Sequence, residues 1–420
     1  MSVGEPYNSM ASTTGIETPH SPLAVPVLMG IVFLSLIGFG VVIPLLPFYA
    51  TVFHASPWQV TLMFAVFAGG QFFGELVWGR LSDQIGRKPV IIGTILICSL
   101  GYLALAFAPN IWLAILARLI AGFFSGNIST IQGYIVDVSP RDRVAGRLGM
   151  VGSAFGVGFI VGPTLGGLLA RPELGEAGFR PPLLVASVLC VLAAGCTVIF
   201  VRESRRRGES GGRRGPGPLQ ALAHALTDRV LQRLLATTFF SFGGFSAMWS
   251  VFGLWGSQRF GWGPKEIGGV MALTGVVSAS SQGLFSGIVA RRVGETRTVI
   301  GGLLCAGGFM LAQAVGLPAP LAIGVMLVIV LSHTMTQPAN ATMVSSAAPH
   351  DQQGATLGAN NAASAVARVL GPMAAGLAFS AVGPWAPFVV GAASLSLAAA
   401  MAYFGGRALT RRLHSPEPLV

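Results

Sequence analysis

The chain has 420 residues, of which 53% are hydrophobic and only 10% are charged, and its mean hydropathy is +0.70. Soluble domains carry about 25% charged residues, so this composition excludes a water-soluble globular fold. The formal net charge of +11 does not indicate nucleic-acid binding, because the basic residues lie at the ends of apolar stretches and not on one surface interleaved with aromatic side chains. We therefore expect a membrane protein with no nucleic-acid partner.

Apolar stretches of about 20 residues, the length that a helix needs to cross a bilayer, recur along the chain with short polar breaks. They predict an all-α membrane protein with twelve transmembrane helices in two six-helix bundles. The predicted spans cover residues 24–49, 58–79, 89–107, 111–136, 145–170, 182–201, 231–255, 265–290, 298–316, 321–347, 355–381 and 386–405.

Positive charge is distributed unevenly between the two sides of these spans. If both termini are cytoplasmic, twenty of the 26 lysines and arginines lie on the cytoplasmic side and four lie outside, as the positive-inside rule requires. A stretch rich in Arg, Gly and Pro cannot bury a core and separates the halves as a linker. The predicted organisation is a disordered cytoplasmic N-terminus at 1–23, bundles at 24–201 and 231–405, a cytoplasmic linker at 202–230 and a cytoplasmic tail at 406–420.

The two predicted bundles repeat one another in parallel. Gly162-Pro163 recurs 209 residues later as Gly371-Pro372. Residues 79–86, which begin and end with glycine, recur with both glycines as residues 287–294, at an offset of 208. A parallel repeat of six spans is the arrangement expected when two bundles rock about a shared site at the middle of the membrane.

A dense motif follows the second predicted span. It has the pattern GxxxDxxGRK and consists of Gly79, Asp83, Gly86, Arg87 and Lys88. The first glycine permits close helix contact, the second allows a tight turn, and the acid lies within reach of two cations. This segment resembles, at every position of the pattern, the signature of the major facilitator superfamily between its second and third helices. The resemblance implies the major facilitator fold and a transport function.

The same resemblance implies contacts for the charged residues of the motif. Asp83 would face the positive start of the eleventh helix, near residues 354–358, and Arg87 would pair with Asp137 at the end of the fourth helix. Breaking this cluster would free the cytoplasmic side to open, so we interpret these residues as gating residues. The alternative is a charge cluster that only sets topology, because exposed ion pairs contribute little.

The fifth predicted span contains a pattern of glycines with one proline. Its members are Gly149, Gly158, Gly162, Pro163, Gly166 and Gly167. The spacing gives a smooth helix face for close packing, and the proline bends or weakens the helix. The pattern resembles that of the antiporter branches of the superfamily, which implies export coupled to proton entry. A packing stripe without such a role is the alternative and fits any transport direction.

Further likeness is to the 12-helix drug:proton antiporter branch, including tetracycline-efflux and multidrug exporters. It rests on residues 38–47 at the end of the first span and on Arg202-Glu203-Ser204 at the end of the sixth. The chain departs from the tetracycline exporters at Ser35 and Gly101, where they carry aspartates in the first and third helices. Tetracycline is therefore not predicted as the substrate.

Two arginines lie inside predicted spans, where a charged side chain costs at least about 2.5 kcal/mol and must face the protein interior. Arg118, in the fourth span, belongs to the pattern Arg118-x3-Gly122-x3-Gly126, which resembles a fourth-helix motif of the superfamily. Arg368 lies midway along the eleventh span. Both are candidates for the substrate cavity, and hydrogen bonding to backbone carbonyls is the alternative role.

Three residues are candidates for proton coupling. Glu75, in the second span, and Asp137, at the end of the fourth, are the acids outside the predicted loops. Burial disfavours the charged form of a carboxylate, so Glu75 is suited to bind and release a proton. The alternative for Glu75 is a structural role, in which it pairs with an interior arginine or caps a hydrogen-bond network. His333, in a polar part of the tenth span, is the third candidate, with a structural network as its alternative.

Polar and aromatic residues within the spans are expected to line the substrate cavity, whose walls should be mostly apolar. The candidates are Gln71, Arg118, Asn127, Phe245, Trp249, Gln282, His333, Gln337, Asn340, Asn361 and Arg368. The sequence contains no phosphate-binding loop, zinc-protease motif or nucleophile elbow. We therefore expect no enzymatic activity, cofactor or metal.

The leading interpretation is a secondary active transporter that exports drug-like or hydrophobic small molecules in exchange for protons by alternating access. Its expected partners are the small-molecule substrate, protons and the lipid bilayer of a bacterial inner membrane, and we expect it to act as a monomer. The second interpretation is a facilitator or importer of a small metabolite or organic anion, with Arg118 and Arg368 holding the anionic group. The third is a sensor that does not transport.

Overall fold

The computed structural model describes residues 24–140, 142–204, 223, 225–349 and 352–414. The predicted N-terminal segment 1–23 and most of the predicted linker lie outside this part of the chain. Within it, every regular element is a helix, as the apolar stretches predict. Eleven helices in the described residues are long and apolar enough to cross a membrane, and a shorter apolar helix, Gly156–Leu169, lies where the remaining span is predicted.

The first bundle corresponds to the six spans predicted before the linker. Its elements are α1 (Ala24–Val42), η1 (Ile43–Leu45), α2 (Leu46–Val52), α3 (Pro57–Ile85), α4 (Arg87–Ala106), α5 (Ile111–Ser125), α6 (Ile128–Asp137), α7 (Val144–Leu169), η2 (Pro172–Phe179) and α8 (Arg180–Phe200). Two boundaries differ from the expectation. α3 continues past residue 79 and places Asp83 on the helix, and the fourth span is broken between α5 and α6 at Gly126 and Asn127.

The second bundle corresponds to the other six predicted spans. Its elements are α10 (Arg229–Phe260), α11 (Pro264–Ser280), the π-helical turn η3 (Ser281–Phe285), α12 (Ser286–Val293), α13 (Glu295–Ala314), α14 (Ala319–Ser346), α15 (Gln353–Ala381) and α16 (Ala386–His414). α16 is longer than hydropathy indicates, so the first residues of the predicted tail are helical.

One backbone feature confirms the repeat at the level of single residues. Gly86 joins α3 to α4 with φ 106°, and Gly294 joins α12 to α13 with φ 92°. The N–H of Gly86 donates to the carbonyl of Ser82, and that of Gly294 donates to the carbonyl of Ala290. Positive φ with extended ψ is essentially restricted to glycine, which explains why glycine occupies this position in both halves.

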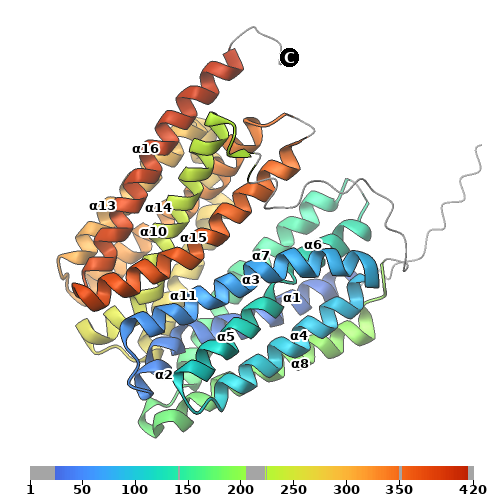
Figure 1. Ribbon diagram of the computed structural model, residues 1–420, viewed down its shortest axis with the longest axis vertical. Helices are drawn as coiled ribbons and strands as arrows, with labels where there is room; N and C mark the ends of the chain where they lie inside the picture. The colour runs from blue at the N-terminus through green and yellow to red at the C-terminus, as the bar shows by residue number, and fades with distance from the viewer. Residues whose placement is uncertain (1–23, 141, 205–222, 224, 350–351, 415–420) are drawn as a thin grey trace, which may run out of the picture.

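The bundles meet through α3 with α15 and through α7 with α11. Glycines make these contacts close: a Cβ at Gly167 would lie 2.5 Å from the carbonyl oxygen of Pro264, and one at Gly376 would lie 2.9 Å from Cα of Trp58. Figure 1 shows the bundles together where α3 begins and diverging toward the other end of α3. We call these the Trp58 end and the Arg87 end.

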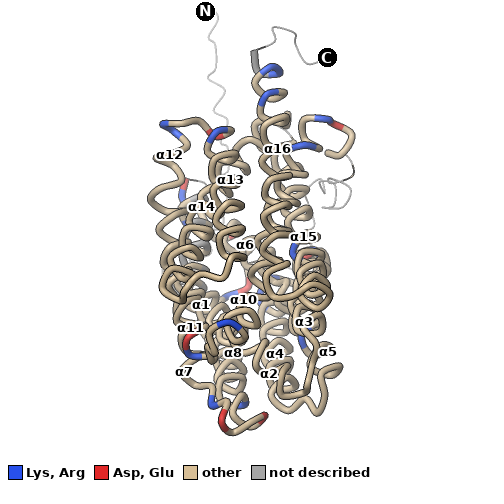
Figure 2. Tube along the Cα trace, turned by 90° about the vertical axis from the view of Figure 1, so that its left-hand side faces the viewer, with Lys and Arg blue, Asp and Glu red and all other residues tan. Residues whose placement is uncertain are grey.

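Charge is concentrated near the helix ends. Figure 2 shows long uncharged stretches of helix between charged residues at the ends of the bundles. Large apolar side chains are exposed along the outside of the helices, for example Leu100 at 60% and Ile199 at 73%. Such an apolar exterior suits lipid, so the structure is that of a multi-pass membrane protein.

Candidate functional site

A cavity of about 960 Å³ lies between the two bundles and is lined by both. Most of its lining is apolar, with polar side chains interspersed among the apolar ones. Seven of the predicted cavity residues line it: Gln71, Arg118, Asn127, Phe245, Trp249, Gln282 and Arg368. The other four predicted residues, His333, Gln337, Asn340 and Asn361, are not among the lining residues. A large apolar cavity with a few polar groups is the usual form of a small-molecule site.

Aromatic rings form opposite walls of this cavity. In the first bundle Phe39 stacks on Phe67, with ring centroids 5.0 Å apart. In the second bundle Phe245 stacks on Trp249 at 5.9 Å, with an interplanar angle of 18°. All four line the cavity. Sequence analysis missed Phe39 and Phe67, because nothing in an apolar helix marks which phenylalanine faces inward.

Arg118 is the most deeply buried charged residue that lines the cavity, with 1% of its surface exposed. It lies on α5 with its guanidinium 4.1 Å from the ring centroid of Phe67. Within the described residues, its Nε and Nη1 have no hydrogen-bond partner. A cation over an aromatic face gains electrostatic energy, but the unpaired N–H groups remain free to donate to a ligand.

Arg368 lines the cavity from α15 in the other bundle. Its Nε is buried and, in the part of the chain that the structure describes, lacks a hydrogen-bond partner. Glu75 on α3 interacts with Arg368 electrostatically across the interface between the bundles. Among the described residues the two side chains do not form an ion pair within 4.0 Å, so a pairing role for Glu75 stays a prediction.

His333 lies behind the cavity wall. Its ring stacks on that of Phe245 with centroids 4.0 Å apart and an interplanar angle of 2°. Its Nε2 is 3.1 Å from Oγ of Ser241 and 3.2 Å from Nε2 of Gln337. With 2% exposure, His333 supports the ring that faces the cavity, which is the structural network of the sequence analysis.

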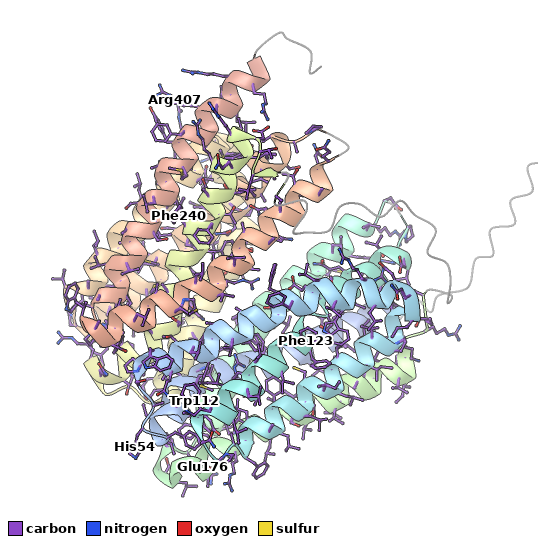
Figure 3. The ribbon with its side chains drawn as sticks, in the orientation of Figure 1. His54, Trp112, Phe123, Glu176, Phe240 and Arg407 are labelled. Carbon is purple, nitrogen blue, oxygen red and sulfur yellow. The ribbon has the colours of Figure 1, made fainter. Side chains whose placement is uncertain are left out.

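Asn340 and Asn361 also lie away from the lining. Asn340 donates to Oγ1 of Thr238 at 2.7 Å, and this hydroxyl donates in turn to Asn360. Asn361 is exposed. Figure 3 shows Phe240 partway along the second bundle and Arg407 near the end of that bundle that points away from the Trp58 end, and it shows His54 and Trp112 at the Trp58 end of the first bundle.

Helix irregularities position two of the polar lining residues. Gln282 lies in the π-helical turn η3 and Asn127 in the break between α5 and α6. The Nδ2 of Asn127 donates to Oγ1 of Thr94 at 2.8 Å, which fixes the break to α4. π-helical turns are frequent at functional sites, but the sequence around Gln282 gives no signal for one.

The charged motif forms a compact cluster at the Arg87 end of the first bundle. Nη2 of Arg87 is 2.8 Å from Oδ1 of Asp83, and its Nε is 3.2 Å from Oδ2 of Asp137. Its Nη1 donates to Oγ of Ser82 at 2.6 Å. The ion pair with Asp137 expected from the motif is therefore present. Since Arg87 is only 6% exposed, the cluster ties together the ends of α3, α4 and α6.

Glu203 completes this cluster, and sequence analysis gave it no role. Its Oε1 accepts from the backbone N–H of Arg87 at 2.9 Å, and its Oε2 accepts from that of Lys88 at 3.1 Å. A carboxylate at the first N–H groups of α4 satisfies donors that have no partner within the helix and complements the helix dipole. The signal in the sequence is the motif Arg202-Glu203-Ser204, whose resemblance to the exporters does not by itself indicate the contact with α4.

The expected contact of Asp83 with the start of α15 involves two segments that stand apart in Figure 1. A Cβ built at Gly354 or Gly358 meets no atom within 4 Å, so this stretch of α15 is open. The contacts of α3 with α15 include Gly69 with Val369, nearer the middle of both helices. The expected contact therefore stays a prediction, for a conformation in which the bundles meet at the Arg87 end.

The glycine pattern of α7 packs on both neighbouring helices. A Cβ at Gly162 would lie 2.6 Å from Cα of Gly40 on α1, and the Cβ position of Gly158 lies 2.7 Å from Cβ of Leu36. Gly167 faces α11 across the bundle interface. The pattern thus serves close packing both within the first bundle and between bundles, and this packing fits either interpretation of the motif.

Comparison with known proteins identifies the family. The description Major Facilitator Superfamily matches residues 28–372, most of the chain. The chain belongs to the major facilitator superfamily. Proteins of this superfamily are transporters and not enzymes, and the predicted fold class and family are confirmed.

Individual relatives within the superfamily are named as resistance proteins. The chain is 30% identical over 367 residues to the tetracycline resistance protein, class C, of Escherichia coli, covering 83% of this chain and 88% of that protein. It is 26% identical over 358 residues to multidrug resistance protein 2 of Bacillus subtilis (strain 168), with 84% and 88% covered. A crystal structure of a bacterial homologue of the human lysosomal transporter Spinster superimposes with a TM-score of 0.76 at 18% identity, covering 95% of this chain and 100% of the other.

Proposed function

We propose that this major facilitator exports drug-like or other hydrophobic small molecules across a bacterial inner membrane in exchange for protons. The observation that carries the proposal is the 960 Å³, mostly apolar cavity that both bundles line. Such a cavity accepts hydrophobic ligands of varied shape. Relatives named as tetracycline and multidrug resistance proteins support export.

Alternating access follows from how the bundles meet. Close glycine contacts hold them together at the Trp58 end, and the Arg87 end is separated. With both termini in the cytoplasm, as the positive-inside rule favours, the Arg87 end is cytoplasmic and the cavity faces inward. Closing that end brings Asp83 toward the start of α15, and the cluster of Asp83, Arg87 and Asp137 then acts as the gate.

The proton-carrying acid is Glu75 or Asp137 in this proposal. Glu75 lies near the bundle interface, where the charge of Arg368 acts on it. Asp137 shares Arg87 with Asp83, so a proton on Asp137 would loosen the gate. His333 is the weakest candidate because it is buried behind Phe245.

Inverted membrane vesicles that contain the protein test this proposal. We expect a hydrophobic fluorescent dye to accumulate in wild-type vesicles and to leave when the pH gradient is collapsed. If Glu75→Gln abolishes the dependence of dye accumulation on the pH gradient, Glu75 carries the proton. If Asp137→Asn does so, Asp137 carries it. Glu295→Gln is the matched control, because Glu295 is exposed and distant in sequence from both. Wild-type accumulation that ignores the gradient would refute proton exchange.

A further inference from the structure

We propose that the preferred substrates are aromatic amphiphilic anions and that Arg368 binds their anionic group. This inference rests on the proposed function and adds the substrate class of the same cavity. It follows from three features of the cavity: unpaired guanidinium N–H groups, the absence of an acid among its described lining residues, and a rigid aromatic surface next to Arg368.

The first feature is the pair of incompletely bonded arginines. Arg118 and Arg368 line the cavity from opposite bundles, and each has at least one buried N–H donor that the described residues leave unsatisfied. A buried donor without a partner costs about 1–3 kcal/mol. A ligand oxygen that accepts from such a donor recovers this cost, and a charged oxygen recovers more.

The second feature is the charge balance. The described lining residues include two arginines and no aspartate or glutamate. Glu75 is the acid whose charge acts on Arg368, but it approaches from α3 and does not itself line the cavity. A cationic ligand would therefore meet two positive charges without a carboxylate in contact. An anionic ligand would compete with Glu75 for Arg368.

The third feature is the aromatic surface beside Arg368. Oγ of Ser246, which lies between Phe245 and Trp249 in sequence, is 3.4 Å from the carbonyl oxygen of Ala367, the residue before Arg368. The stacked rings of Phe245 and Trp249 line the same cavity as Arg368, on the neighbouring helix α10. His333 stacks on the far side of Phe245 and holds it in place. A planar aromatic body fits this surface while its carboxylate or sulfonate reaches Arg368.

Because Glu75 and an anionic substrate compete for Arg368, the protonation of Glu75 affects substrate binding. When Glu75 is neutral, Arg368 is free for the substrate, so a proton on Glu75 and an anion on Arg368 favour one another. Exchange needs the opposite relation between proton and substrate. The exchanged proton therefore belongs to another acid, and Asp137 in the gate cluster is the remaining candidate.

The test is a binding titration of the purified protein in detergent without anionic lipid. The probes are 1-pyrenebutyrate and its neutral amide, which share the same aromatic body. We expect the wild type to bind the anion about tenfold more tightly than the amide, as one charge-assisted hydrogen bond would give. Arg368→Gln should remove this preference, and Arg368→Lys should keep part of it. Glu75→Gln should tighten anion binding by a few-fold, because the competing charge is gone.

The control is Arg292→Gln, an exposed arginine at the end of α12, which should leave the preference unchanged. Equal wild-type affinity for anion and amide would overturn the inference without any variant. So would an Arg368→Gln variant that weakens both probes equally, since a structural role would do that. Short-chain phosphatidylglycerol that displaces pyrenebutyrate at equal concentration would assign the site to a lipid headgroup and overturn the small-molecule assignment.

This inference and the proposed function fail separately. If vesicles accumulate an uncharged dye under a pH gradient but the purified protein shows no anion preference, proton-driven export stands and the substrate class is wrong. If the preference and its dependence on Arg368 hold but no gradient-driven export of dye or pyrenebutyrate occurs, the binding site stands and the proposed function is wrong.

Discussion

The two bundles make the same turn at the same point of the repeat with opposite charges around it. Gly86 and Gly294 adopt nearly the same backbone conformation and begin α4 and α13. At the offset of 208 residues that relates them, Asp83 corresponds to Arg291 and Arg87 corresponds to Glu295. The backbone turn is thus repeated, and the sign of each charge is reversed.

The surroundings of the two turns differ as much as their charges. Arg87 is buried between two carboxylates, and Glu203 binds the first N–H groups of its helix. Arg291 and Glu295 are exposed. The backbone turn therefore requires glycine in both halves. Only in the first bundle do the charged residues beside the turn form a buried cluster. This is the difference expected if one turn alone serves as a gate.

Replacing the central cation is the strongest way to test this difference. Arg87→Gln leaves Asp83 and Asp137 without their shared cation, and breaking a buried pair in this way costs about 3 kcal/mol. Glu295→Gln, at the equivalent position of the second bundle, should change stability by no more than about 0.5 kcal/mol. Thermal unfolding of both purified variants in detergent measures the contrast.

Equal shifts of the two unfolding midpoints would show that the two turns contribute alike, and the contrast drawn from burial would be wrong. Arg87→Lys adds a graded control, because lysine keeps the charge but cannot contact both carboxylates in the geometry of the planar guanidinium. It should recover part of the lost stability.

The glycines themselves give a smaller effect that separates backbone strain from crowding. Alanine at either position must adopt a conformation that costs about 1–3 kcal/mol. A Cβ at Gly86 would also lie 2.5 Å from Oε2 of Glu203, whereas one at Gly294 meets no atom within 4 Å. Gly86→Ala should therefore lower the unfolding midpoint more than Gly294→Ala. In the background of Glu203→Ala the two substitutions should have equal effects, and an undiminished difference there would exclude crowding by Glu203 as its cause.

Much of the fold was predictable because hydropathy predicts membrane helices and glycine marks particular backbone turns, and both depend mainly on the local sequence. An apolar run of bilayer length must form a helix in lipid, since its backbone groups have no other partners. Gly86 and Gly294 mark the repeat in the sequence because their φ and ψ strongly favour glycine. The break at Asn127 and the π turn at Gln282 were missed, because contacts with neighbouring helices determine them.

The candidate site was predictable in part for the same reason. Arg118 and Arg368 were found because charge is so costly in an apolar helix that it must face inward. Polarity predicts that His333 lines the cavity, but the residue lies behind Phe245, where its Nε2 contacts Ser241 and Gln337. Polarity predicts an inward direction and does not distinguish a cavity from the packed layer behind it.

The second bundle has an ion pair of its own at the Arg87 end, and its loss should have the smallest effect on stability. Oδ2 of Asp228 accepts from Nη2 of Arg412 at 2.6 Å, and Oδ1 accepts from the backbone N–H groups of Val230 and Leu231 at the start of α10. Partial burial acts to raise the pKa of Asp228, but these hydrogen bonds outweigh it and lower the pKa below its ordinary value.

Because the pKa of Asp228 is lower in the folded protein, its stabilisation is complete above the ordinary carboxyl pKa of about 3.9 and is lost as the pH falls through the folded value. Asp228→Asn should cost about 1 kcal/mol at pH 7, and the difference from wild type should stay constant down to about pH 5 and shrink below about pH 4. Asp142→Asn is the matched control, since Asp142 is 75% exposed in its pair with Arg143. The measurement is the unfolding midpoint of wild type and both variants across this pH range. A stability difference between wild type and Asp228→Asn that grows on acidification would mean that Asp228 does not stabilise the bundle as an anion.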